Sequence, residues 1–426
     1  MTGVRRKLSA MMFLQIFIWG AWMPLNYGYL PILKFSSWQQ GWILSLFGIA
    51  AILAMFFSTQ FADRNFAAER FMAFSHLVGG AAILGLTWVE SFWPFFGLMA
   101  VHCLFYVPTL SISNSIAFAH LQDAQSEFGK VRLWGTIGWI AASLPFVFIL
   151  TDWQQVASLQ TTGVSEWINA VFSSSLQGEA AIKGMRYSFT VAGIASLLLA
   201  GYCLFLPHTP PRTAKHNDDK LAWLEAVRLL KIGFLFALFA VTLLDSIVHK
   251  SYFVFAARYF TSIGVQPNWV MPVMSIGQLS EIAAMWLLGL TLKRLGWRYT
   301  LLIGILAHAL RFGLFAFYPY PSVAIAANLL HGVCFAFYIA TVYIFVDEFF
   351  PKDARASAQG LFNLLILGVG PLIANFAGPY LVERYTNAQS GLVDYRSLFQ
   401  IPIWLAIAAA VLLLVSFFPP AKQKSV

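Results

Sequence analysis

The chain is dominated by continuous apolar runs, each about 20 residues long, separated by short polar segments. A run of that length crosses the hydrocarbon core of a bilayer as a helix, whereas strands of a membrane barrel alternate apolar and polar residues. Charged residues make up only 11% of the 426 residues, against about 25% in typical soluble domains. The sequence therefore predicts an all-α polytopic membrane protein and excludes an ordinary globular enzyme.

The apolar runs predict twelve transmembrane helices. They are expected near residues 8–33, 39–61, 69–90, 93–119, 132–151, 186–206, 232–260, 266–292, 299–318, 321–349, 357–383 and 398–419. The first run follows a basic start, as in a signal peptide, but it is too long and no small-residue cleavage site ends it. We therefore expect a retained first helix.

The distribution of basic residues predicts the orientation of these helices. Most of the 27 Lys and Arg residues fall in segments that share one side of the membrane with the N-terminus. The positive-inside rule then places both termini in the cytoplasm, in a cytoplasmic (inner) membrane. The net charge of +9 is explained by this topology and does not indicate nucleic-acid binding.

One polar linker divides the predicted helices six and six. We expect an N-terminal six-helix bundle at 1–206, a cytoplasmic linker at 207–231 and a C-terminal six-helix bundle at 232–426. Within the linker, residues 221–230 look amphipathic and suit the inner membrane surface. The long outer loop at 152–185 has no readable role.

Two basic loops occupy equivalent places in the two halves. They are Ala62–Arg70, between the second and third spans, and Lys293–Arg298, between the eighth and ninth. Both resemble the basic loop motif of the major facilitator superfamily. The resemblance implies the major facilitator fold, built from two repeated halves.

Seven short strings, spread over nearly the whole chain, resemble those of one family within that superfamily, the nucleoside:proton symporters, which are bacterial nucleoside permeases. The strings are Trp19–Trp22, Gly48–Ala51, Tyr106–Thr109, Arg132–Trp139, Gly277–Glu281, Arg311–Phe312 and Arg355–Gly360. The resemblance implies proton-coupled uptake of nucleosides. It also implies that five residues line the substrate site, namely Arg132, Thr136 and Trp139 on helix five with Gln278 and Glu281 on helix eight.

The chain departs from this family at two places. The acidic residue of helix ten falls at Ala336, and the helix-seven amides of some members are replaced by the segment Asp245–Lys250. Asp245 and His249 are four residues apart and share a helix face. Together with Lys250, they are expected to neutralise one another's charges or to pair with groups on a neighbouring helix. The alternative is an altered substrate site, or a proton relay formed by Asp245 and His249.

Glu281 lies within an apolar segment, where an acidic side chain is unfavourable by about 2.5–3.5 kcal/mol. Gln278 is three residues earlier on the same face. This pair can bind the hydroxyls and base edges of a nucleoside, or it can form a polar contact between helices. A carboxylate at this place can also bind and release the coupled proton.

Arg311 lies deep in helix nine and needs a partner there. Glu281 is the nearest carboxylate by sequence, and their contact would be a structural ion pair or would tune proton binding. His308 shares the face of Arg311, and we interpret it as a satisfied core histidine.

Three residues of the first half have two interpretations each. Arg132 either snorkels at the cytoplasmic edge or points into a cavity toward substrate. Trp139 either stacks on a base or packs in the core. Asn114, on helix four, either hydrogen-bonds substrate or links two helices.

The sequence contains no P-loop, no metal-ligand cluster and no nucleophile with its base. The three cysteines lie in separate spans and predict neither disulfides nor a metal site. We therefore expect no enzyme activity and no cofactor. The first hypothesis is a secondary transporter of a small polar solute, a nucleoside, with protons. The alternatives are a proton-coupled carrier of a sugar or other polar metabolite, and a transporter-like membrane sensor.

Overall fold

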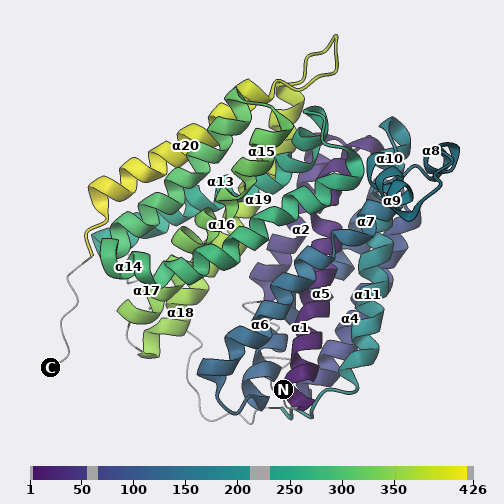
Figure 1. Cartoon of the computed structure of the whole chain (residues 1–426). Coiled ribbons are helices and arrows are strands. Elements are labelled where there is room, and N and C mark those ends of the chain that lie inside the picture. Colours follow the sequence, from purple (N-terminus) through teal and green to yellow (C-terminus); the bar gives the residue numbers. More distant parts are fainter. Residues whose placement is uncertain (1–2, 55–65, 212–230, 351, 420–426) are drawn as a thin grey trace. The chain divides into compact units, whose positions relative to one another are not determined.

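The computed structural model describes residues 3–54, 66–211, 231–350 and 352–419, with backbone alone at 124–126 and 352–357 (Figure 1). The described chain is helical, and its β-structure is limited to two isolated bridges, Thr151 with Ser175 and Thr386 with Val393. The all-α fold predicted from the apolar runs is confirmed. The end of the span predicted at 39–61, part of the basic loop predicted at 62–70 and most of the linker at 207–231 lie outside the described residues.

The described helices account for the predicted spans. Among them, nine are long and apolar enough to cross a membrane, in the ranges Gly3–Leu33, Ala68–Trp88, Phe92–His120, Glu127–Ile149, Gly233–Ser262, Pro267–Phe317, Pro321–Phe349, Ala358–Arg384 and Tyr395–Ser416. Two more, α2 (Ser37–Leu53) and α11 (Tyr187–Cys203), have 17 residues each. The 51-residue helix α14 (Pro267–Phe317) holds two predicted spans, because Gly296 interrupts it with a φ of 71°. This pattern agrees with a twelve-helix fold.

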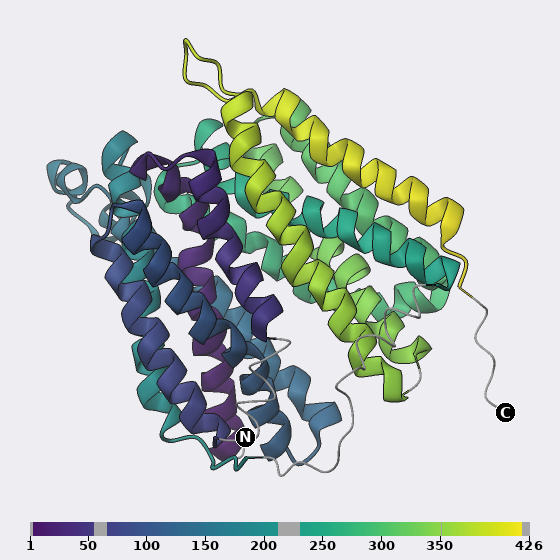
Figure 2. The ribbon, with the colours of Figure 1, turned by 180° about the vertical axis from the view of Figure 1, so that it is seen from behind.

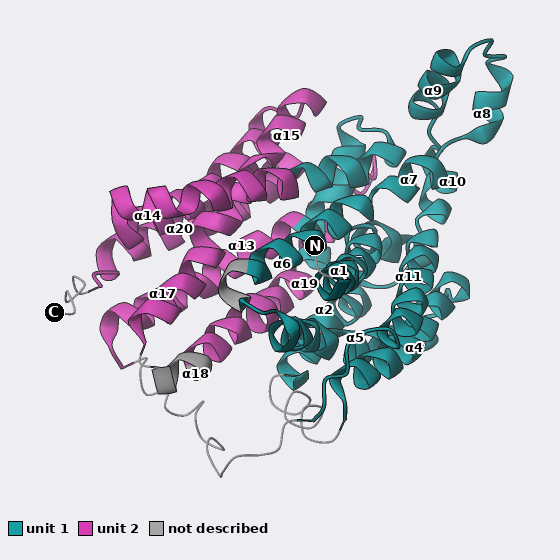
Figure 3. Ribbon diagram, turned by 60° about the horizontal axis from the view of Figure 1, so that its bottom comes forward, with its two compact units in different colours: residues 1–215, 253–276, 378–380 teal, residues 216–252, 277–377, 381–426 magenta. Residues whose placement is uncertain are grey.

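The chain forms two compact units (Figure 3). The first contains residues 1–215, 253–276 and 378–380, and the second contains residues 216–252, 277–377 and 381–426. The later part of α13 (Gly233–Ser262) and the first residues of α14 are therefore grouped with the N-terminal helices.

The first unit is a helix bundle in which α1 (Gly3–Tyr29) contacts α5 (Phe92–His120), α6 (Ala124–Ala141) and α11. Helix α4 (Ala68–Gly85) packs on α5 and α11, and α2 packs on α5. Figure 2 shows these helices, in purple and blue, from behind. Helix α7 (Leu144–Ile149) completes the fifth span. The large apolar side chains left exposed along the long helices, such as Trp93, suit contact with lipid.

The segment at 152–185, predicted to be an outer loop, is folded and belongs to the first unit. It contains α8 (Trp153–Ser158), α9 (Val164–Ser173) and α10 (Gly178–Gly184). Trp269, at the start of α14, donates its Nε1–H to the carbonyl of Phe172 at 2.9 Å, and the Asn268 N–H donates to Ser175 Oγ at 3.2 Å. The segment therefore fixes the beginning of the eighth span to the end of the fifth.

In the second unit two spans are built from several pieces. The tenth span joins α15 (Pro321–Asn328), α16 (Leu330–Cys334), the π-helical turn η4 (Phe335–Ala340) and α17 (Thr341–Phe349). The eleventh joins α18 (Lys352–Asn363), the π-helical turn η5 (Leu364–Val369) and α19 (Gly370–Arg384). Helix α20 (Tyr395–Ser416) is the last. Turns of π-helix inside α-helices are frequent at functional sites.

Candidate functional site

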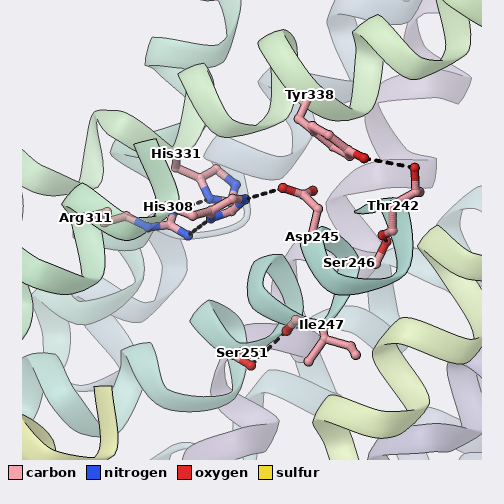
Figure 4. A network of polar contacts seen from close by, with 9 residues as sticks. All are labelled: Thr242, Asp245, Ser246, Ile247, Ser251, His308, Arg311, His331 and Tyr338. Carbon is pink, nitrogen blue, oxygen red and sulfur yellow. Dashed lines mark hydrogen bonds and ion pairs between the residues drawn. The ribbon is translucent and has the colours of Figure 1, made fainter. Parts of the chain in front are cut away.

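A cluster of ionisable side chains lies buried in the second unit, where three spans meet. Asp245 and His249 come from α13, His308 and Arg311 from α14, and His331 from α16. The turn spacing explains the pairs within each helix, because residues three or four apart share a face. Figure 4 shows four members of the cluster, Asp245, His308, Arg311 and His331, with dashed lines for their contacts.

Arg311 is completely buried and is held by two histidines. Its Nη1 lies 2.8 Å from His331 Nδ1, and its Nη2 lies 3.1 Å from His308 Nδ1. The guanidinium carbon lies 4.2 Å from the centre of the Tyr252 ring. The face of an aromatic ring attracts a cation, so Tyr252 and the histidines together solvate the arginine charge inside the bundle.

The Asp245 carboxylate is paired with His308 across two helices. Its Oδ1 lies 3.6 Å from His308 Nε2, and both side chains are fully buried. Figure 4 shows the carboxylate pointing toward the histidines, with Thr242 and Tyr338 on its other side. Those two hydroxyls lie 3.0 Å apart and are hydrogen-bonded to each other. His308, expected to be a satisfied core histidine, is thus the bridge between Asp245 and Arg311.

His249 belongs to the same cluster through ring contacts. Its ring centre lies 5.0 Å from that of His331 and 5.5 Å from that of His308. The sequence analysis did not single out His331. An ionisable residue inside an apolar span was the signal that could have found it.

Gln278 and Glu281 lie on the turn of α14 that packs directly on α16. Gln278 is buried and Glu281 is half-buried. The Gly332 N–H donates to Ser280 Oγ at 3.1 Å. A side chain at Gly332 would collide with the backbone of Ser280 and Glu281. Gln278 and Glu281, the predicted substrate-binding pair, therefore lie on a helix turn that contacts the turn carrying His331.

Ala336, where the family resemblance in the sequence implies an acidic residue, is a core residue here. It is fully buried in the π-helical turn η4 and packs in an apolar cluster with Ala284, Leu288, Phe337 and Ala340. This apolar packing gives a carboxylate no place there. The buried acidic residue in this part of the second unit is instead Asp245.

In the first unit, the predicted residues Arg132, Thr136 and Trp139 follow one another at one-turn spacing along α6. Arg132 is exposed, while Thr136 and Trp139 are half-buried. The Trp139 ring makes an edge contact with Trp19, with ring centres 5.5 Å apart. It also lies 6.3 Å from the ring of Phe253. Trp139 is therefore part of an aromatic cluster with Trp19 and Phe253, and its side chain remains partly accessible to solvent.

Asn114 lies on α5 and is half-buried. It is separate in the sequence from the α6 residues but belongs to the same unit. Among the described residues, no three His, Cys, Asp or Glu side chains are grouped so that they could hold a metal ion.

An all-helical membrane fold with an arginine and an acidic residue buried between its helices is typical of secondary transporters, among other membrane proteins. Residues 2–162 and 154–422 match the family model described as nucleoside H+ symporter. The chain belongs to this family of membrane transporters, and the resemblance seen in the sequence is confirmed.

Two curated relatives from Escherichia coli (strain K12) cover most of the chain. The putative nucleoside transporter YegT is 32% identical over 397 residues, which are 91% of this chain and 87% of YegT. The nucleoside permease NupG is 26% identical over 444 residues, which are 100% of this chain and 97% of NupG.

Among solved structures, the crystal structure of a mutant of the nucleoside transporter NupG is similar to this chain. The TM-score is 0.81 at 25% sequence identity, and the match covers 98% of this chain and 100% of that one. The predicted transporter fold is confirmed by this likeness.

Proposed function

We propose that this chain carries nucleosides across the cytoplasmic membrane together with protons, by alternating access. The observation that carries the proposal is the match of nearly the whole chain to the nucleoside H+ symporter family. The relative NupG, matched over 97% of its length, is named a nucleoside permease, which supports the same substrate class.

The proposed substrate-binding groups suit the chemistry of a nucleoside. A guanidinium donates hydrogen bonds to base carbonyls, a carboxylate accepts them from ribose hydroxyls, and an amide can do both. An indole ring offers a face for stacking on a base. These groups are Arg132, Thr136, Trp139 and Asn114 in the first unit, and Gln278 and Glu281 in the second.

The proposed proton-coupling groups are Glu281, Asp245, His249 and Arg311. Their support is burial in an apolar bundle, where ionisable side chains are rare unless they serve transport. Asp245 and Arg311 are nearly or completely buried and are joined through one histidine. A proton that binds in such a cluster changes its net charge by one, and so favours a different packing of the surrounding helices.

The proposed topology has both termini in the cytoplasm, with six-helix halves at 1–206 and 232–426 joined by the linker at 207–231. The excess of basic residues on the side of the N-terminus supports it. Movement of one half against the other would expose the substrate site to each side in turn.

The test is uptake of radiolabelled uridine into proteoliposomes, with an inward proton gradient and with that gradient collapsed by a protonophore. We expect accumulation with the gradient and only equilibration without it; protein-free liposomes measure leakage. Folded protein that takes up no nucleoside would contradict the proposal. Uptake of a sugar in its place would identify a carrier of another polar metabolite, and binding without uptake would identify a sensor.

A pair of variants on one helix tests the substrate site. We expect Trp139→Ala to raise the KM for uridine by about 2- to 12-fold, since an aromatic stacking contact contributes about 0.5–1.5 kcal/mol. Trp134→Ala is the matched control, because the Trp134 side chain is exposed on the same helix. Equal effects of the two changes would remove Trp139 from the site.

A further inference from the structure

The Asp245 carboxylate is buried without the hydrogen bonds that normally accompany a buried charge. Within the described part of the chain, neither of its oxygens has a hydrogen-bond partner. Its one ion-pair contact there is the 3.6 Å approach of His308 Nε2. An unsatisfied buried polar group is unfavourable by about 1–3 kcal/mol, and more when charged. A carboxylate that served only to hold helices together would be better satisfied than this.

The hydrogen bonds of Arg311 determine where His308 carries its proton. A guanidinium has donors and no acceptor, so the Nδ1 atoms of His308 and His331 must both accept from it. A neutral imidazole that accepts at Nδ1 carries its hydrogen on Nε2. The His308 Nε2–H therefore faces the Asp245 carboxylate.

This arrangement decides which group can take up an additional proton. A second proton on His308 would have to sit on Nδ1, opposite an N–H of Arg311, and would break that hydrogen bond. The same reasoning applies to His331. Neither oxygen of Asp245 accepts a hydrogen bond within the described residues, and the His308 Nε2–H approaches Oδ1 only to 3.6 Å. The carboxylate is therefore the proton acceptor among the groups that Arg311 and His308 link.

Each helix segment packed around Asp245 carries further ionisable groups. These groups are His249, Lys250 and Tyr252 on α13, His308 and Arg311 on α14, and His331, Cys334 and Tyr338 on the tenth span. Among them, Arg311 is the cation that balances the carboxylate through His308.

We propose that Asp245 is the proton-binding group of the transport cycle, and that His308, oriented by Arg311, is its positioning residue. The inference rests on the proposed symport function and selects one residue among its coupling groups. In the step itself, an outer water-borne proton binds to a carboxylate oxygen and gives a neutral acid. On the inner side the acid returns this proton to water, so one proton is bound and one is released.

The experiment measures substrate-induced proton uptake, as alkalinisation of a weakly buffered medium when uridine is added to de-energised cells. Uridine counterflow, which requires no net proton movement, is measured in parallel. For Asp245→Asn we expect proton uptake to fall at least tenfold while counterflow stays within about threefold of the wild-type rate. Ser251→Ala is the control on the same helix, because Ser251 hydrogen-bonds to its own helix at Ile247.

The outcomes separate this inference from the proposed function. No alkalinisation by wild-type protein would contradict proton symport itself. Normal alkalinisation by Asp245→Asn, or loss of its counterflow as well, would overturn the role of Asp245. Alkalinisation lost only in Glu281→Gln would assign the proton to Glu281.

A second variant keeps the test decisive if Asp245→Asn does not reach the membrane. His308→Phe preserves the ring volume and removes the Nε2–H that faces Asp245. We expect it to displace the pH profile of uridine uptake by about one unit, which corresponds to a tenfold change in proton affinity. A pH profile identical to that of the wild type would show that His308 does not position the proton site.

Discussion

The two units each bury a histidine in a polar network, but only one of the networks is complete. In the first unit, His76 is hydrogen-bonded at both nitrogens, to Ser196 Oγ at 3.0 Å and to Gln15 Oε1 at 2.9 Å. The Gln15 amide in turn donates to Thr109 at 2.8 Å. In the second unit, the Asp245 carboxylate has a 3.6 Å contact with His308 and no hydrogen bond within the described residues.

The difference distinguishes a network that only stabilises the fold from one that can respond to a proton. Every group in the His76 network is neutral or has its partner, so a single arrangement of the four helices is favoured. The Asp245 network joins an acidic group to an arginine through one histidine, and it has unused acceptor capacity. A proton on Asp245 would use acceptor capacity of the second network, whereas both ring nitrogens of His76 already have hydrogen-bond partners.

The largest effect is expected from Arg311→Met. Removing the cation leaves the buried carboxylate of Asp245 uncompensated, which is unfavourable by about 3–5 kcal/mol. We expect a lower apparent Tm in detergent and loss of proton-driven uptake. The double variant with Asp245→Asn should recover part of the lost stability, because the two sites act through His308. Strictly additive losses would mean that the charges do not interact.

Gly332→Ala should break the contact between α14 and α16. The added methyl group meets the backbone of Ser280 and Glu281, and overpacking of this kind is destabilising by about 1–3 kcal/mol. The expected result is a lower apparent Tm and a smaller increase of Tm when uridine is added. Gly289→Ala is the control, because a side chain there meets nothing within 4 Å. Equal melting temperatures for the two variants would contradict the close approach.

The same substitution at the two histidines tests the comparison directly. We expect His76→Phe to reduce stability by about 1–3 kcal/mol, because Gln15 and Ser196 lose their buried partner. The folded fraction of this variant should keep the wild-type pH profile of uptake, in contrast to His308→Phe. A displaced profile for His76→Phe would show that the first network also responds to protons.

The smallest effect is expected at Asp394, an exposed carboxylate that caps α20. Hydrogen bonds with Ser397 lower the pKa of Asp394 from 3.8. The ionised form therefore adds stability above pH 3.8, and this stability is lost as the pH falls through the lowered pKa. Asp394→Ala should reduce stability by about 0.5–1 kcal/mol at neutral pH. Urea titrations at neutral pH and at a pH below the lowered pKa check this, and an equal loss at both would contradict it.

The fold was predictable from the sequence because hydrophobic length alone determines where helices can cross a bilayer. The break at Gly296 also falls within the predicted basic loop at 293–298. The structure of the segment at 152–185 was not predictable. Its three helices are short, and their position depends on contacts with Trp269 and Asn268, which are distant in the sequence.

Side-chain pairing was the least predictable part of the site. Helical spacing indicates which residues share a face, as for Asp245 with His249, but it does not indicate which helix lies opposite. Arg311 needed a buried partner, and the structure provides two histidines, one of them His331 on another helix. The ion pair of Asp245 with His308 depends in the same way on tertiary packing.

The glycine contact between α14 and α16 has a mechanical consequence. Gly332 meets the peptide between Ser280 and Glu281 with no side chain in between, and Gly277 lies against the ring of His331. Flexible side chains would absorb a small shift of one helix, but backbone in direct contact cannot. A ligand that displaces Glu281 would therefore displace the His331 turn as well, because the two helix backbones are in direct contact.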